Sequence, residues 1–108
     1  MQCVMVESQA RFAADKMQKV ALFQSERLFC DLYCLAPDQA QHLHSHPHSD
    51  KVYYVTSGCA TIQVGEEIAE VESGVAVLAP AGLSHGVTNR SRGPVTVLVF
   101  MAPRPEHG

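Results

Sequence analysis

Residues 74–89 read GVAVLAPAGLSHGVTN and contain two short runs typical of β-strands, with a turn between them. Residues 75–79 are mostly small and apolar. Pro80 and Gly82 then break the run, because proline cannot donate to a sheet and glycine favours tight turns. A second short strand follows His85 directly. A histidine between a turn and a strand is held firmly, which makes His85 a candidate functional residue.

Short strands between turns also fill the rest of the chain from residue 26 onward. Residues 26–35 alternate between two faces, and residues 52–57 are rich in β-branched and aromatic side chains. A glycine-containing hairpin turn at residues 65–67 separates two further strands, and residues 95–101 form a last apolar strand. Many short strands with frequent turn signals predict an all-β sandwich or barrel.

The length of 108 residues fits a single domain, 1–108, which we expect to have three parts. Residues 1–24 form an N-terminal segment, residues 25–101 form the barrel, and residues 102–108 form a loose, proline-rich tail. Within the first part, residues 8–17 form either a short helix or an irregular segment.

The composition is that of an ordinary globular protein. The net charge is −3 with neutral histidines, and no basic cluster indicates nucleic-acid binding. No apolar run reaches the ~18 residues of a spanning helix, and the opening MQCVMVESQARF lacks the pattern of a secretory signal. We therefore expect a cytoplasmic protein that binds neither nucleic acid nor membranes. Its four cysteines are expected to be free thiols: Cys3, Cys30, Cys34 and Cys59.

Four of the six histidines lie within seven residues, in the stretch 41–58 that reads QHLHSHPHSDKVYYVTSG. His44 and His46 are two residues apart, so on an extended segment both imidazoles project to the same side. Two imidazoles on one side can share a metal ion if a third ligand comes from elsewhere. His85 is the natural third ligand, so the three histidines together predict a metal site.

The second half of the chain resembles the cupin superfamily in one specific motif. The spacing Gly74-x5-Pro80-x-Gly82-x2-His85-x3-Asn89 matches the second signature motif of that superfamily at every defined position. The superfamily has another defining motif nearer the N-terminus, which is compared below. With both motifs included, the resemblance covers about residues 24–101.

The first cupin motif is matched with two departures. It runs from a glycine through five residues to His-x-His, then three or four residues to a glutamate and six more to a glycine. His44, His46 and Gly58 follow that spacing, but Asp38 stands at the opening glycine and Lys51 at the glutamate.

The resemblance implies a double-stranded β-helix, or jelly-roll, barrel with a metal near its mouth. Carried over by position, His44, His46 and His85 are the metal ligands, and zinc, iron, nickel and copper all accept imidazole. Cupins with histidine-only sites include dioxygenases. The resemblance thus implies a metal-dependent, dioxygenase-like enzyme acting on a small molecule. The alternative is a non-enzymatic barrel that holds a small anion with Lys51 as the charge partner.

Lys51 is the departure that bears on function. A protonated lysine has no lone pair to offer a metal, and at 4 Å from a divalent ion in an effective dielectric of 20 the repulsion is on the order of 8 kcal/mol. Lys51 must therefore swing away, lose its proton or exclude the metal. Asp50 is a candidate fourth ligand if a bulge brings it inward, and otherwise a solvated residue or the partner of Lys51. Tyr53 shares the parity of Lys51, and these two are the catalytic candidates.

The remaining histidines and tyrosines have expected places but no assigned role. His42 shares the parity of His44, and we expect His42 and His48 at the rim of the site and no role for His107. Tyr33 and Tyr54 are expected to be packing residues.

A homodimer is expected, because barrel strands expose edges that need covering. The N-terminal segment and the strand that starts at Glu26 are the expected interface. The alternative is a monomer with that segment folded back on its own barrel.

Overall fold

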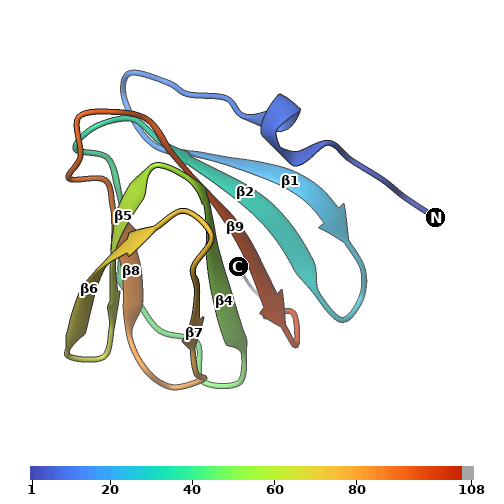
Figure 1. The fold of residues 1–108 in the computed structure, drawn as a ribbon. Helices are drawn as coiled ribbons and strands as arrows, with labels where there is room; N and C mark the ends of the chain where they lie inside the picture. The colour runs from blue at the N-terminus through green and yellow to red at the C-terminus, as the bar shows by residue number, and fades with distance from the viewer. Residues whose placement is uncertain (106–108) are drawn as a thin grey trace.

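The fold consists of two antiparallel β-sheets that face each other, as the computed structural model shows for residues 1–105 (Figure 1). The five-stranded sheet has the order β1-β2-β9-β4-β7, and the four-stranded sheet has the order β3-β8-β5-β6. The predicted all-β jelly-roll barrel is confirmed. The expectation for His107 lies outside the described residues. The strands are β1 (Gln18–Gln24), β2 (Phe29–Leu35), β3 (Ala40–His44), β4 (Asp50–Ser57), β5 (Cys59–Val64), β6 (Glu67–Glu72), β7 (Ala76–Ala79), β8 (His85–Thr88) and β9 (Val95–Ala102).

The space between the two sheets is filled by strand residues of one parity. Val55 of β4 and Val97 of β9 are direct partners in one sheet, and Ile62 of β5 belongs to the other. All three are at most 2% exposed and pack into one cluster. Burial of such side chains contributes roughly 25 cal/mol per Å² of apolar surface. A slip of one residue would turn these side chains outward, so the core fixes the register of the strands.

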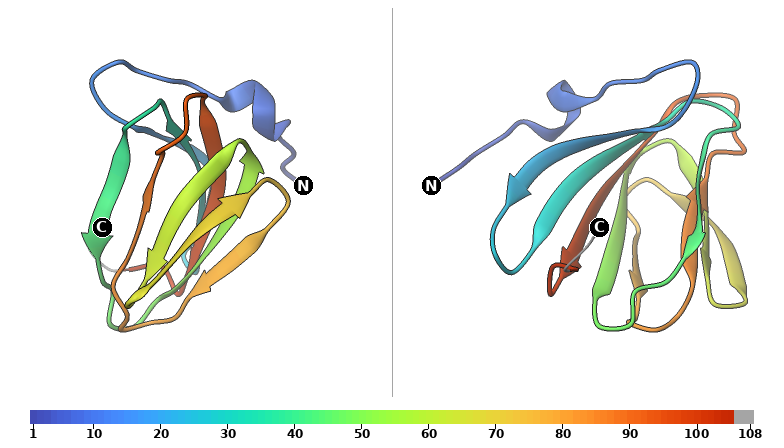
Figure 2. Two further views of the ribbon diagram at one scale, coloured as in Figure 1. Left: turned by 60° about the vertical axis from the view of Figure 1, so that its left-hand side comes forward. Right: turned by 180° about the vertical axis from the view of Figure 1, so that it is seen from behind.

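The N-terminal segment lies against the outer face of the five-stranded sheet (Figures 1 and 2). It contains a 3-10 turn, η1 (Val6–Gln9), and is otherwise irregular up to residue 17. Val6 and Ala10 pack on Leu32 and Cys34 of β2, which explains why both faces of β2 are apolar. The helical alternative for residues 8–17 is therefore wrong. The structure also shows a strand that we did not expect. This strand, β1, lies within residues 1–24, where the sequence predicted none.

Asp38 occupies a backbone position that suits glycine. Its φ is +70°, in the left-handed region that aspartate tolerates better than most residues. The departure from the family glycine is therefore compatible with the same turn. The Asp38 N–H donates to the carbonyl of Asn89 at 2.7 Å. The buried Asn89 side chain in turn donates to the carbonyls of Leu35 and Gly93, which makes it a structural residue, as expected.

A β-bulge in β3 sets the orientation of the first histidine motif. Gln41 pairs with Val87 and His44 pairs with His85, so two residues of β3 stand opposite Gly86 alone. Because of this extra residue, Gln41 is buried while His44 also faces inward. His42 is exposed, because the bulge interrupts the simple alternation that its parity with His44 assumed.

The bulge packs directly on Gly86, and we expect Gly86→Ala to lower the free energy of unfolding by about 1–3 kcal/mol. A Cβ at this position would meet the Gln41 oxygen at 2.8 Å and the Leu43 nitrogen at 3.2 Å, and both are backbone atoms. Gly93→Ala is the matched control, because a Cβ there meets nothing within 4 Å. Urea denaturation of the two variants checks this. Equal effects would show that the bulge is not tightly packed.

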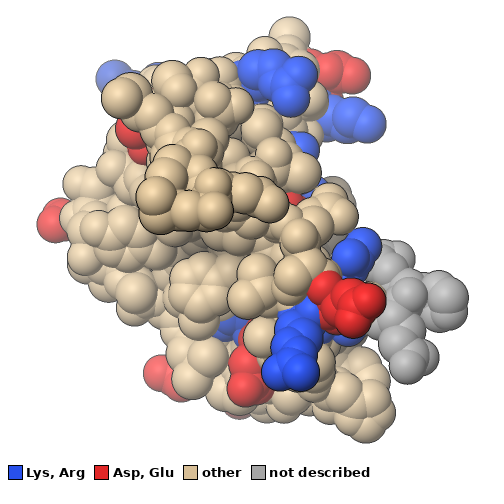
Figure 3. Space-filling model, turned by 90° about the vertical axis from the view of Figure 1, so that its right-hand side faces the viewer, with Lys and Arg blue, Asp and Glu red and all other residues tan. Residues whose placement is uncertain are grey.

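The surface carries no large patch of like-charged side chains on the side where the N-terminal segment and the β1–β2 hairpin lie. Basic and acidic side chains are interspersed there, and much of the middle is uncharged (Figure 3). Among residues 1–105, no helix has the length and apolar character needed to cross a membrane. All four cysteines are free thiols, as expected.

Candidate metal centre

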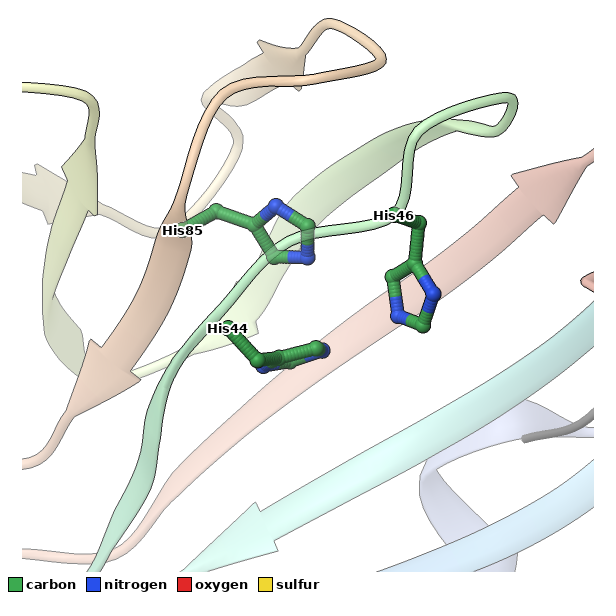
Figure 4. A group of neighbouring side chains, drawn as sticks. All are labelled: His44, His46 and His85. Atoms are coloured by element: carbon green, nitrogen blue, oxygen red, sulfur yellow. The ribbon is translucent and has the colours of Figure 1, made fainter.

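Three histidines converge at one end of the barrel. His44 ends β3, His46 lies in the loop before β4, and His85 begins β8. Their rings point toward one another (Figure 4). One ring nitrogen from each lies within 4.8 Å of the other two, and the ring centroids of His44 and His85 are 4.5 Å apart. The structure thus brings together the three residues that the sequence singled out.

Two of the rings are oriented by backbone carbonyls. The Nδ1 atom of His44 lies 3.0 Å from the carbonyl oxygen of His42, and Nδ1 of His85 lies 3.2 Å from that of Leu83. A carbonyl accepts only, so each Nδ1 carries the proton and each Nε2 presents a lone pair. Histidine ligands of metals are commonly held in this way.

The Nε2 atom of His85 has no hydrogen-bond partner among the described residues although it is buried. A buried acceptor left unpaired costs about 1–3 kcal/mol, so native structures rarely tolerate one. A metal ion held with His44 and His46 would satisfy this lone pair. The three side chains therefore fit a divalent transition metal, and imidazole nitrogens suit zinc, iron, nickel and copper.

The environment keeps all three imidazoles neutral, the form in which they bind metals. Burial, together with the positive charge of Lys51, lowers the pKa of His85 from its ordinary 6.5 to about 4. Burial likewise lowers the pKa of His44 and of His46. Protons therefore compete weakly with a metal for this site near neutral pH.

Lys51 is buried beside the three histidines, as its parity with Tyr53 predicted, and is 1% exposed. Its Nζ donates to the Tyr33 hydroxyl at 3.1 Å and to the Gln41 side-chain oxygen at 3.2 Å. It also lies over the rings of Tyr33 and Tyr53, 5.1 and 5.0 Å from their centroids. Within residues 1–105 its hydrogen-bond partners are thus neutral.

Desolvation is the main cause of an unusual pKa at Lys51. Burial, reinforced by the charge of Lys19, lowers this pKa from 10.5 to about 7. The carboxylate of Asp31 acts in the opposite direction but does not compensate. With a pKa of about 7, Lys51 exchanges its proton near neutral pH, so a nearby cation favours its neutral form and a nearby anion favours its ammonium form.

Asp50 lies outside the histidine cluster. Its side chain is exposed, and its Oδ1 accepts a hydrogen bond from the Ala81 N–H at 2.9 Å. Asp50 thus joins the start of β4 to the turn before His85. His42 and His48 are both exposed and outside the cluster.

Tyr53 lies near the site, as expected, with its ring centroid 6.2 Å from that of His85. Its hydroxyl donates to the Gln41 side-chain oxygen at 3.0 Å, and the Gln41 side-chain nitrogen donates to Tyr33 at 2.8 Å. Sequence reasoning missed the roles of Gln41 and Tyr33 in this network. Gln41 was hidden by the bulge, and no pattern distinguished Tyr33 from a packing residue.

A pocket of about 260 Å³ opens beside the histidines. Its polar lining includes His44, His46 and Lys51, with Lys19 of β1 at the edge. The site therefore has room for a small molecule next to the place where a metal would bind.

The chain is similar to several known proteins. The profile of the family described as "Cupin domain" matches residues 31–101. Tetracenomycin polyketide synthase protein TcmJ of Streptomyces glaucescens is 35% identical over 77 residues, which cover 68% of this chain and 52% of that protein. This chain thus spans about half the length of TcmJ.

Two further relatives match nearly the whole chain. Uncharacterized protein SCO3923 of Streptomyces coelicolor is 33% identical over 98 residues, covering 90% of this chain and 91% of that protein. The crystal structure of TT1209 from Thermus thermophilus has a TM-score of 0.95 and 48% identity, covering 97% of this chain and 100% of that one. With the motifs, the two-sheet barrel and the family match in agreement, the chain belongs to the cupin domain family.

Proposed function

We propose that the protein binds one divalent transition metal ion through His44, His46 and His85 and is a metal-dependent enzyme acting on a small molecule. The observation that carries this proposal is the buried Nε2 of His85, which has no hydrogen-bond partner within residues 1–105 and faces two further imidazoles. Three neutral ligands leave the full charge of the ion in place and some of its coordination positions open.

The residues of this chain have separate roles in the proposed reaction. The three histidines hold the ion, which supplies Lewis acidity and, if redox-active, a means of activating dioxygen. Lys51 and Tyr33 line the pocket and orient the substrate. The walls of the pocket exclude part of the solvent, which strengthens the polar interactions inside.

The relative TcmJ supports a small organic molecule as the substrate. Its name associates it with tetracenomycin polyketide synthase, and it matches residues of this chain at 35% identity. The pocket, at about 260 Å³, also suits a small molecule. If the bound metal is iron, we expect a dioxygenase-like reaction.

Metal analysis followed by a matched assay tests the proposal. We expect the untagged protein to contain close to one equivalent of a transition metal. Iron would lead to oxygen-uptake assays with small organic substrates, and zinc would lead to hydrolysis and isomerisation assays. The proposal fails if the protein stays metal-free after incubation with zinc, iron(II), nickel and copper salts. A non-enzymatic binding barrel would then be the better description.

A further inference from the structure

The base of the pocket presents two hydrogen-bond donors that the protein does not use. The Tyr33 hydroxyl accepts one bond from Lys51 and one from Gln41, which occupies both of its lone pairs. Its own proton has no acceptor among the described hydrogen bonds. A protonated Lys51 has three N–H groups and uses two of them, on Tyr33 and Gln41.

The orientation of the Gln41 amide is fixed by its neighbours. Its oxygen accepts from both Lys51 and Tyr53, and its nitrogen donates to Tyr33. The reverse orientation would place the amide N–H groups against the ammonium of Lys51. Both lone pairs of the Gln41 oxygen are thus in use, so the Tyr33 O–H and the third N–H of a protonated Lys51 have no acceptor on Gln41 and remain available to a ligand.

The pocket is also electropositive in a protein whose net charge is −3. Its described lining includes Lys19 and Lys51 but no aspartate or glutamate. Both ammonium groups lie close to the Tyr33 ring, 5.3 Å (Lys19) and 5.1 Å (Lys51) from its centroid. Asp31 acts on both lysines through space but does not line the pocket.

The remaining wall of the pocket is apolar. Phe29, Met101 and Pro105 line it together with the polar groups. A ligand that fits both parts has an anionic group at one end and an apolar body at the other.

We infer that the pocket binds a small organic oxyanion, such as a carboxylate or an enolate. Its charged oxygen accepts hydrogen bonds from the Lys51 ammonium and the Tyr33 hydroxyl, and its apolar part packs on Phe29 and Met101. This inference rests on the proposed function, since it names the substrate class of the same site. It gives Lys51 a task that the usual glutamate of this position does not have. Lys51 and Tyr33 are then the residues that determine specificity.

Isothermal titration of the zinc-loaded protein with matched anionic and neutral probes tests the inference. The probes are acetate with acetamide and benzoate with benzamide, because each pair shares a shape and differs in charge. We expect at least one carboxylate to bind ten-fold or more tightly than its amide. Lys51→Met and Tyr33→Phe should each lower the binding affinity for that carboxylate by about ten-fold or more. Lys16→Met, which removes an exposed lysine outside the pocket, should have no effect.

The outcomes separate the inference from the proposed function. Zinc content is measured for every variant, and thermal unfolding shows whether each variant is folded. If no carboxylate binds better than its amide, or if Lys51→Met binds carboxylates as wild type does, the inference is wrong even when zinc is bound. If wild type binds none of zinc, iron(II), nickel and copper, the proposed function fails, and the same titration of the metal-free protein still decides the inference.

Discussion

Replacing His85 with leucine is expected to lower zinc affinity by about two orders of magnitude or more, because the site loses one of three ligands. The metal-free variant should nevertheless be at least as stable as wild type. Leucine fills a similar space and removes the buried Nε2 atom that has no partner within residues 1–105. A competition titration with a zinc chelator measures affinity, and urea denaturation in EDTA measures stability.

The same variant should change the acid dependence of stability. Burial lowers the pKa of His85 from 6.5 to about 4, so between these values the unfolded chain binds a proton that the folded chain does not. Wild-type stability is therefore lost as the pH falls through this window, by up to about 3 kcal/mol. His85→Leu should lack this loss. His42→Ala is the control, because His42 is exposed, and it should change neither quantity. Unchanged zinc affinity in His85→Leu would contradict the assignment.

Replacing Lys51 with methionine is expected to raise the free energy of unfolding at pH 7 by an amount on the order of 3 kcal/mol. The fall of the Lys51 pKa from 10.5 to about 7 corresponds to nearly 5 kcal/mol of unfavourable burial of the charge. The loss of two hydrogen bonds and of the contacts with the Tyr33 and Tyr53 rings offsets part of this gain. The melting temperature should rise by roughly 10 °C.

The pH dependence distinguishes this cause from a general packing effect. Between pH 7 and 10.5 the unfolded chain holds the proton of Lys51 and the folded chain has released it, so wild-type stability rises with pH in this window. The advantage of Lys51→Met should therefore be largest at or below pH 7 and fade toward pH 10.5. Denaturation curves at pH 6, 8 and 10 check this, with Lys16→Met as the exposed-lysine control. A less stable Lys51→Met would show that the network needs the ammonium group.

The sequence was sufficient to predict the barrel and the histidine cluster because both depend on local spacing. The pattern of short strands and the spacing of Gly74, Pro80, Gly82, His85 and Asn89 are visible along the chain. His44 and His46 are neighbours at any register, and the turn before His85 brings it to the same end of the barrel.

The network around Lys51 was not predictable, because it depends on how distant strands meet. Gln41 reaches Lys51 only because a bulge in β3 reverses the parity between Gln41 and His44. Tyr33 lies 18 residues from Lys51 along the chain, and their contact follows from the order of β2, β9 and β4 in the sheet. The strand β1 was not predicted either. Its residues show no clear alternation of apolar and polar side chains, and the strand is defined by its pairing with β2.

The central claim is that His44, His46 and His85 hold a transition metal, and X-ray absorption spectroscopy of the zinc-loaded protein tests it most directly. The claim predicts a first shell of nitrogen and oxygen ligands at about 2.0–2.1 Å, with the outer-shell scattering of three imidazole rings. His85→Leu should reduce the imidazole count by one or abolish binding. A first shell with sulfur at about 2.3 Å, or one without imidazole scattering, would contradict the claim.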